Sequence, residues 1–329
     1  MSAPARTGRK RLLDVLRIGF LLLILVVVAI ALWSNWAEVR DDLRRLGPVT
    51  LLVATGLALL SPFFTVLGWR VLMADLGSRL HIAPASGVFF VGQLGKYLPG
   101  SVWSVVVQTD MAARLGVPRR RTAVVGLLCI AVSALTGMIA GLPALPVLLT
   151  RGDAVIPWWS LLLIIGVLGV LLWPPLLNWG IRTLLRLLGR DPLEHDLTHV
   201  AVGLSSLWFT SSWLTGGLAV WVMARNVAPE DADASRLLLV AVSGYLLAAG
   251  IGMFSIVVPA GVGVRDGVLA LLLATQMPFS AATAVVVVAR FLTVLADVVW
   301  AAVGWLWARS HHLLPSTTGS APTEPDPAP

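Results

Sequence analysis

Three residues that could bind an anion lie together in the middle of an apolar segment. Gln93, Lys96 and Tyr97 fall within residues 85–107, which have the length and character of a membrane-spanning helix. A lysine near the middle of a bilayer is unfavourable by about 2.5–3.5 kcal/mol. Lysine is a compact positive charge that suits phosphate. One interpretation is therefore a site for an anionic headgroup, and the other is a structural lysine that caps helix carbonyls.

The same segment is interrupted by glycine and proline at Gly95, Pro99 and Gly100. Proline removes a helical hydrogen bond and pushes the residue before it out of the helical region. Non-helical backbone at membrane depth survives only where protein or water covers it, and broken helices commonly build substrate sites. We expect two half-helices that meet at residues 97–100. The alternative is a kinked helix whose lysine reaches the headgroups.

A second break also combines proline, glycine and charged residues. Pro259, Gly261 and Gly263 precede the adjacent charges Arg265 and Asp266. In the functional interpretation, the two charges line the same cavity as the first break. In the structural interpretation, the carboxylate lies at the start of a helix, where the helix dipole favours a negative charge. Both can hold at once.

Arg290 and Asp297 lie two helical turns apart on one face of the last apolar segment, residues 281–307. Ionisable residues within a membrane are functional candidates by default. The alternative is that they neutralise each other or pair with other buried charges, and we expect Asp297 to be partly hydrated. Three cations at depth are hard to accommodate separately. We therefore expect Lys96, Arg265 and Arg290 to share one hydrated cavity.

The composition is that of a polytopic membrane protein: 57% of the 329 residues are hydrophobic and 12% are charged, against about a quarter charged in soluble domains. The single cysteine, Cys129, allows no intramolecular disulfide. Most of the net charge of +7 comes from arginines at segment ends, which indicates orientation in the bilayer rather than nucleic-acid binding. The 14 tryptophans are interpreted mainly as interface anchors.

No constellation with the spacing of an enzyme active site is readable, so we predict no catalytic residues, cofactor or metal. The nearest candidate is the loop Glu194-His195-Asp196, which with His199 places two histidines four residues apart. That spacing could hold a metal. An ordinary hydrated connector is the preferred interpretation.

We predict an all-α polytopic integral membrane protein with about six full spans and two broken re-entrant hairpins. The full spans are expected at residues 18–33, 49–69, 122–142, 158–177, 200–223 and 281–307. Arg182, Arg186 and Arg190 indicate a short amphipathic helix at the membrane surface. Residues 1–17 form a basic cytoplasmic N-terminus, residues 18–309 the transmembrane domain and residues 310–329 a disordered tail.

Arginine and lysine are concentrated on one side when both termini are placed in the cytoplasm. The two hairpins then enter from opposite faces, as in the inverted repeats of transporters. No residue-level repeat is readable. In the competing topology, every apolar block is a full span.

The two breaks resemble the signatures of a known family. Residues 95–100 (GKYLPG) with Trp103, and residues 259–263 (PAGVG) with Arg265 and Asp266, are similar to those of the flippase-like membrane family, also named for the transmembrane region of lysylphosphatidylglycerol synthase. The resemblance covers roughly residues 10–309. It implies a multi-pass protein of the bacterial inner membrane that moves a lipid between leaflets. Two-domain relatives add a soluble aminoacyl-transferase domain, and we do not expect that chemistry here.

The expected function is therefore translocation of a phospholipid or lipid-linked molecule, and not enzymatic activity. The implied partners are membrane lipids with an anionic or phosphate-bearing headgroup and a separate lipid-modifying enzyme, with no nucleic acid. Two alternatives stay open. One is an integral-membrane transferase or accessory subunit acting on lipid-linked substrates, and the other is a secondary transporter of small solutes or ions.

Overall fold

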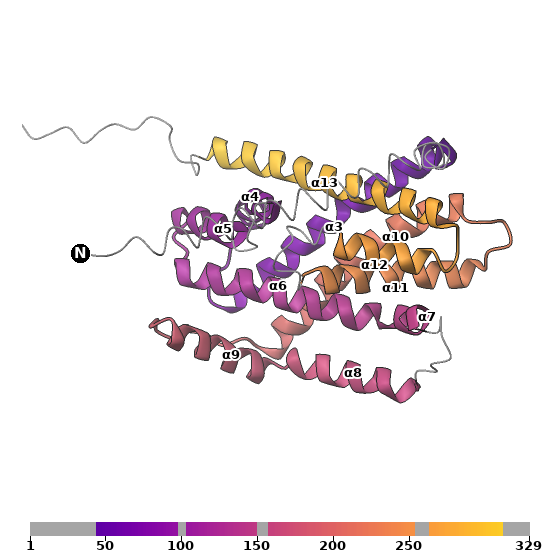
Figure 1. The fold of residues 1–329 in the computed structure, drawn as a ribbon. Coiled ribbons are helices and arrows are strands. Elements are labelled where there is room, and N and C mark those ends of the chain that lie inside the picture. The colour runs from indigo at the N-terminus through magenta and orange to yellow at the C-terminus, as the bar shows by residue number, and fades with distance from the viewer. Residues whose placement is uncertain (1–43, 98–102, 150–156, 254–262, 312–329) are drawn as a thin grey trace, which may run out of the picture.

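A computed structural model describes residues 44–97, 103–149, 157–253 and 263–311, which form a helical bundle containing no β-strand (Figure 1). The first elements are α3 (Gly47–Asp75), α4 (Ile82–Gln93), the 3₁₀ turn η1 (Leu94–Tyr97), α5 (Trp103–Arg114), α6 (Arg119–Gly141), η2 (Leu142–Ala144) and α7 (Leu145–Leu149). The later elements are α8 (Trp158–Leu171), α9 (Pro174–Leu187), α10 (His199–Val227), α11 (Ala234–Met253), α12 (Val264–Leu273) and α13 (Phe279–Ser310).

Five of the described helices are long and apolar enough to cross a membrane, or six if the bent pair α8 and α9 is one span. The predicted all-α polytopic fold is therefore confirmed. The predicted N-terminal region 1–17, the first span 18–33 and most of the tail lie outside the described residues.

Proline and glycine set where several helices begin and end. α6, α8 and α13 begin directly after Pro118, Pro157 and Pro278. Proline is tolerated there because the first amides of a helix have no intrahelical acceptor. Gly77 and Gly189, just beyond α3 and α9, have φ angles of +96° and +64°. This left-handed conformation suits glycine and closes the end of a helix.

Helices α4 and α5 form an antiparallel hairpin with short limbs. Each limb has 12 residues, a rise of about 18 Å against a bilayer core of roughly 30 Å. A Cβ atom at Gly95 would lie 2.5 Å from the backbone nitrogen of Ser104, and one at Gly92 would lie 2.3 Å from Cγ of Gln108. The absence of a side chain at Gly92 and Gly95 therefore allows α4 and α5 to pack in direct contact. This is the first predicted hairpin, although its turn at residues 98–102 lies outside the described residues.

Helices α11 and α12 form a second antiparallel hairpin, in which Gly252 faces Arg265 and Gly244 faces Leu272. Its limbs are unequal. α11 has 20 residues and is long enough to span by itself, whereas α12 has 10. The second hairpin thus combines a full-length helix with a short one, because the apolar run before the break is longer than the run before the first break.

The second half of the bundle repeats the order of elements of the first half and packs in the corresponding way. Each half runs as a long helix, a hairpin and a long helix. α4 packs against α13 as α11 packs against α6, and α3 crosses α10 at the centre. The hairpins open at opposite ends of the bundle (Figure 1). At one end of α3, Leu46 packs in the same cluster as Leu237 and Met277, and beyond the other end Gly77 accepts a hydrogen bond from Arg121.

The predicted span at residues 158–177 is not one straight helix. α8 ends at Leu171, and α9 starts at Pro174 with its axis turned by 52°. The adjacent prolines Pro174 and Pro175 cannot donate the backbone hydrogen bonds that would continue α8. α9 is amphipathic, as expected from the arginine spacing, and carries Arg182 and Arg186, whereas Arg190 lies beyond its last residue, Leu187.

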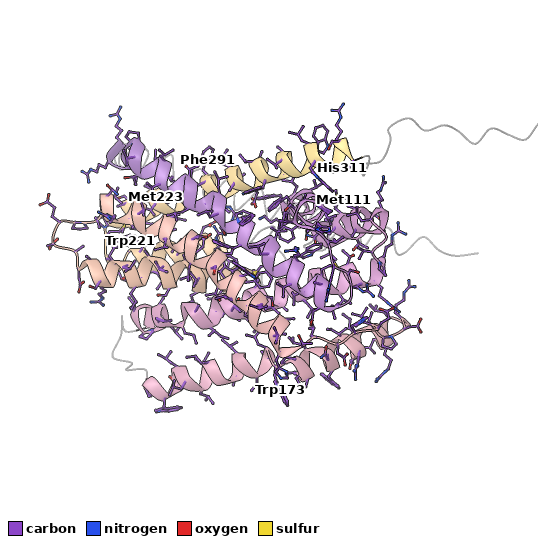
Figure 2. All side chains as sticks on the ribbon, turned by 180° about the vertical axis from the view of Figure 1, so that it is seen from behind. Met111, Trp173, Trp221, Met223, Phe291 and His311 are labelled. Carbon is purple, nitrogen blue, oxygen red and sulfur yellow. The ribbon has the colours of Figure 1, made fainter. Side chains whose placement is uncertain are left out.

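The interior holds more aromatic side chains than the anchor interpretation of tryptophan predicts. Trp69 is completely buried. Trp300 stacks on Phe90 with ring centroids 4.8 Å apart, and its indole N–H donates to the carbonyl of Leu59. Other apolar side chains, such as Phe291, face outward on the bundle surface (Figure 2), as expected where lipid is the solvent.

Candidate functional site

The tip of the first hairpin carries Lys96 and Tyr97. Helix α4 tightens into the 3₁₀ turn η1 at Leu94, and the close approach at Gly95 fixes this turn against the start of α5. 3₁₀ turns are frequent at helix ends. The sequence break therefore places a cation and a phenol at the inner end of a hairpin.

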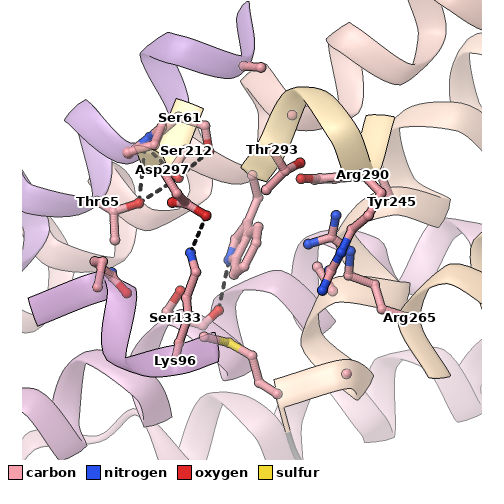
Figure 3. Close-up of a pocket in the computed structure, with 18 of the residues that line it drawn as sticks. Ser61, Thr65, Lys96, Ser133, Ser212, Tyr245, Arg265, Arg290, Thr293 and Asp297 are labelled. Atoms are coloured by element: carbon pink, nitrogen blue, oxygen red, sulfur yellow. Dashed lines mark hydrogen bonds and ion pairs between the residues drawn. The ribbon is translucent and has the colours of Figure 1, made fainter. Parts of the chain in front are cut away.

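Asp297, in the middle of α13, contacts both of these side chains. Nζ of Lys96 lies 2.7 Å from Oδ2 of Asp297, and the Tyr97 hydroxyl donates to the same oxygen at 2.5 Å (Figure 3). The side chain of Asp297 is 5% exposed and that of Lys96 is 32% exposed. The expectation of a partly hydrated Asp297 is thus wrong, because its pairing with the hairpin tip buries it.

Two arginines and a tyrosine form the other side of the site. Arg265 enters from the first turn of α12, and its guanidinium lies 5.1 Å from the ring centre of Tyr245 on α11. Arg290 reaches the same region from α13 (Figure 3). Cations stack favourably on aromatic faces. Because Gly252 has no Cβ, the first carbons of the Arg265 side chain can pass α11 closely.

Asp266 acts mainly at the start of α12. Its Oδ2 accepts the backbone N–H of Gly263 at 3.3 Å, and its Oδ1 lies 3.8 Å from Nε of Arg265. Gly263 precedes the helix with a φ of +84°, a conformation that favours glycine. Asp266 therefore lies at the start of α12, as the structural interpretation predicts, and it also forms a long ion pair with Arg265.

These side chains surround one cavity of about 240 Å³. It is lined by residues from α3, α4, η1, α5, α6, α10, α11, α12 and α13, so both halves of the bundle contribute. Six of the seven residues predicted as substrate-binding line it, namely Gln93, Lys96, Tyr97, Arg265, Arg290 and Asp297. Asp266 stands just behind Arg265. Of the predicted break residues, Gly95 and Gly263 are placed as above, and Pro99, Gly100, Pro259 and Gly261 lie outside the described residues.

The sequence interpretation missed a group of hydroxyls on the cavity wall. Ser212 of α10 shares hydrogen bonds of 2.9 Å with Ser61 and 2.8 Å with Thr65, both on α3. Trp213 also lines the cavity, and its indole N–H donates to the carbonyl of Ser133 at 2.9 Å. The richness of residues 200–223 in serine, threonine and glycine was the available signal.

Tyr245 was the other residue missed. The chain has two tyrosines, and both line this cavity. A tyrosine within an otherwise aliphatic segment of a tyrosine-poor chain was a signal that sequence reasoning could have used. A buried phenol usually finds a partner for its polar end.

The loop before α10 holds ion pairs. Glu194 contacts Arg120 and Arg121, and Asp196 contacts Arg182. The hydrogen bond from Arg121 holds the pKa of Glu194 at about 2, well below its ordinary value. Among the residues that the structure describes, no group of three histidine, cysteine or acidic side chains is placed to bind a metal.

Comparison with known families agrees with this architecture. The sequence model of the family described as the lysylphosphatidylglycerol synthase transmembrane region matches residues 18–301. The chain belongs to this family. No curated protein matches the chain. Family membership and the apolar helices make it a multi-pass membrane protein related to lipid modification or translocation.

Proposed function

We propose that this member of the family moves a lipid with a phosphate-bearing headgroup between the two leaflets. The observation that carries the proposal is the cavity at which the inner ends of two opposed hairpins meet, because it is lined by three cations from both halves. Lys96, Arg265 and Arg290 are the side-chain types that bind phosphate oxygens. A site reached by hairpins from both ends of a bundle is the arrangement of alternating-access carriers.

The proposal gives the chain the role of a carrier rather than a transferase. A transferase needs a general base or a metal near its substrate. The loop with two histidines is the nearest candidate in sequence, and its carboxylates at Glu194 and Asp196 are engaged by arginines. Modification of the lipid would then fall to a separate membrane enzyme, which is the partner that we propose.

The proposal also includes location and orientation. The family resemblance suggests the inner membrane of a bacterium. The end of the bundle with the α6 start carries the dense arginine cluster at Arg114, Arg119, Arg120 and Arg121. Short cytoplasmic loops carry an excess of such residues. Both termini then lie in the cytoplasm.

The test is reconstitution into liposomes that contain lipids with a fluorescent headgroup or acyl label. An impermeant reductant, dithionite, destroys the fluorescence of the outer leaflet, so translocation appears as loss beyond about one half. We expect loss with anionic phospholipid probes, and a rate that rises with protein density. Liposomes without protein, and liposomes with an unrelated helical membrane protein, are the controls. Loss no greater than in these controls, for every headgroup, contradicts the proposal.

A further inference from the structure

Asp297 is the one acidic side chain among the described residues that line the cavity. The lining residues from α3, α4, α5 and α10 are not ionisable, and no histidine is among the described lining residues. The other ionisable side chains around the cavity are Lys96 and Tyr97 (η1), Cys129 (α6), Tyr245 (α11), Arg265 (α12) and Arg290 (α13). Ammonium, guanidinium, phenol and thiol groups already carry their protons at neutral pH. Asp297 is therefore the lining group that can take up a proton when the pH falls.

The carboxylate of Asp297 is held by the hairpin tip rather than by its own helix. Both donors, Lys96 and Tyr97, belong to η1 and contact the same oxygen, Oδ2. Arg290 lies seven residues before Asp297 on α13, which corresponds to a rise of about 10 Å. A small displacement of the hairpin tip would therefore remove both donors from Asp297 at once.

Such a displacement would leave a buried carboxylate without these donors. The side chain of Asp297 is 5% exposed, and a buried carboxylate that loses its partners is neutralised by a proton rather than kept as an anion. The side chain of Lys96 is 32% exposed, so water and a proton can reach the pair. The position of the tip and the protonation of Asp297 are therefore linked, and each favours the other.

Protonation of Asp297 would leave Lys96 in need of another anion. The described lining holds no second acid, and residues 98–102 and 254–262 contain none in their sequence. Asp266 stands behind Arg265, with Oδ1 3.8 Å from its Nε. A lysine ammonium group pairs well with a phosphate oxygen. Asp297 and an anionic headgroup would therefore compete for the same ammonium group.

We propose that Asp297 is the proton-binding site of a proton-coupled carrier, and that its protonation releases Lys96 to bind the phosphodiester of an anionic cargo. The proton forms an O–H bond on the carboxylate. Lys96 keeps its ammonium charge and exchanges its contact with Oδ2 for one with the headgroup phosphate. A proton (+1) and a phosphodiester (−1) together add no net charge, so loading places no extra charge at membrane depth.

This inference rests on the proposed function and adds its source of energy, because a proton gradient would drive a cargo that binds together with a proton. The linkage is reciprocal. The cargo raises the affinity of the site for a proton, and a lower pH raises the affinity of the site for the cargo.

The test measures proton uptake on binding. The purified full chain in detergent is titrated calorimetrically with short-chain phosphatidylglycerol, whose phosphodiester stays singly charged, from about pH 8 to about pH 5, a range in which buried carboxylates titrate. Titrations in buffers of different ionisation enthalpy give the number of protons taken up per lipid. We expect uptake approaching one proton, and an affinity that rises at least about tenfold as the pH falls. Binding without proton uptake at every pH overturns the inference.

Asp297→Asn removes the proton site and keeps Lys96. We expect this variant to bind phosphatidylglycerol at pH 8 about as tightly as the wild type does at pH 5, without proton uptake, because the amide does not compete as an anion. Asp266→Asn is the matched control. It should keep the wild-type proton uptake, because Asp266 is engaged by Gly263 and Arg265. Uptake that persists in Asp297→Asn, or that disappears in Asp266→Asn, contradicts the assignment of the proton to Asp297.

Lys96→Gln covers the case in which Asp297→Asn fails to fold. This variant has no ammonium group for which the carboxylate and the cargo can compete. It should bind phosphatidylglycerol more weakly at every pH and take up no proton on binding. Wild-type proton uptake in Lys96→Gln would show that the exchange at Lys96 does not occur. The calorimetric result for the wild type decides the proton linkage without any variant.

The outcomes separate this inference from the proposed function. Proton uptake on binding without translocation in liposomes leaves the inference standing and contradicts the proposed function, whereas translocation without proton uptake does the reverse. Glycerophosphoglycerol, the same headgroup without acyl chains, distinguishes a lipid from a soluble phosphodiester. It should bind more weakly than the lipid with the same proton uptake. Binding as tight as that of the lipid would contradict a lipid cargo and leave the proton linkage standing.

Discussion

The ion pair between Lys96 and Asp297 is the contact on which the cavity wall depends most directly. One carboxylate oxygen holds both Lys96 and Tyr97, so α13 is fastened to the tip of the first hairpin. Removing one partner of a buried pair leaves an uncompensated charge, whereas removing both leaves none.

We therefore predict that Lys96→Gln destabilises the protein by about 3 kcal/mol, near the lower end for broken buried pairs, because Lys96 is about one third exposed. Asp297→Asn should have a smaller effect. The double variant should recover most of the loss. Thermal unfolding in detergent measures all three. Additive losses in the double variant would show that the two side chains are not coupled.

Glu194 gives a pH-dependent prediction outside the membrane-spanning segments. Its hydrogen bond with Arg121 lowers the pKa from 4.5 to about 2 in the folded protein. Because the folded-state pKa is the lower one, the contact stabilises fully above about pH 4.5 and is lost as the pH falls through about 2. We expect Glu194→Gln to be less stable than the wild type at pH 7 and pH 5, with the difference vanishing toward pH 2. A difference that persists unchanged at pH 2 would mean that the carboxylate charge is not its source.

The hairpin of α4 and α5 depends on two glycines, Gly92 and Gly95. At Gly95, an added Cβ would fall 2.5 Å from backbone nitrogen that has no freedom to move aside. The close packing of α4 against α5 therefore requires glycine at position 95. The contact that it allows outweighs the low helix propensity of glycine.

We predict that Gly95→Ala destabilises the protein by about 1–3 kcal/mol, as overpacking does, and reduces binding of anionic lipid. The matched control is Gly166→Ala on α8, where a Cβ would meet nothing within 4 Å. That variant should be neutral or stabilising by up to about 1 kcal/mol, because alanine is the better helix former. Equal effects of the two substitutions on unfolding temperature would argue against the close approach of the hairpin limbs.

The open end of the first hairpin should face the cytoplasm. Arg79 precedes the hairpin and Arg119 follows it, and both side chains are exposed. In a Cys129→Ala background, cysteines placed singly at these two positions should both be shielded from an impermeant thiol reagent added outside. A cysteine at Glu230, in the loop at the opposite end of the bundle, should react. Labelling at only one of the first two positions would show that residues 82–114 cross the membrane.

At the scale of the whole molecule, the cavity is enclosed by helices of both halves. A probe inside the cavity therefore detects changes in either half. Cys129 lines the cavity from α6 and is the chain's single cysteine. We predict that a small permeant maleimide reacts with it slowly, because it is buried, and that anionic lipid changes the rate whereas zwitterionic lipid does not. Cys129→Ser provides the background. A rate insensitive to every lipid would mean that cargo does not occupy this cavity.

Part of this architecture was predictable from local sequence. A charge or a proline within an apolar run is unfavourable at membrane depth. Lys96, Arg265, Arg290 and the two breaks could therefore be identified from the sequence as candidate site residues. The bend at Pro174 was equally readable, yet the apolar run across it was interpreted as one span. The unequal limbs of the second hairpin follow from the same kind of pattern, because the apolar run before the second break is longer than the run before the first.

The sequence by itself determined that the chain is a helical membrane protein with two interrupted segments and five charges at depth, because each of these features is a property of one segment. The tertiary structure decided which charges meet. Tyr97 and Asp297 are 200 residues apart in the chain, and only the packing of α4 against α13 brings them together. It also decided that Tyr245 and the hydroxyls of α3 and α10 share the cavity, because the composition of one segment does not show which residues of the other helices it will face.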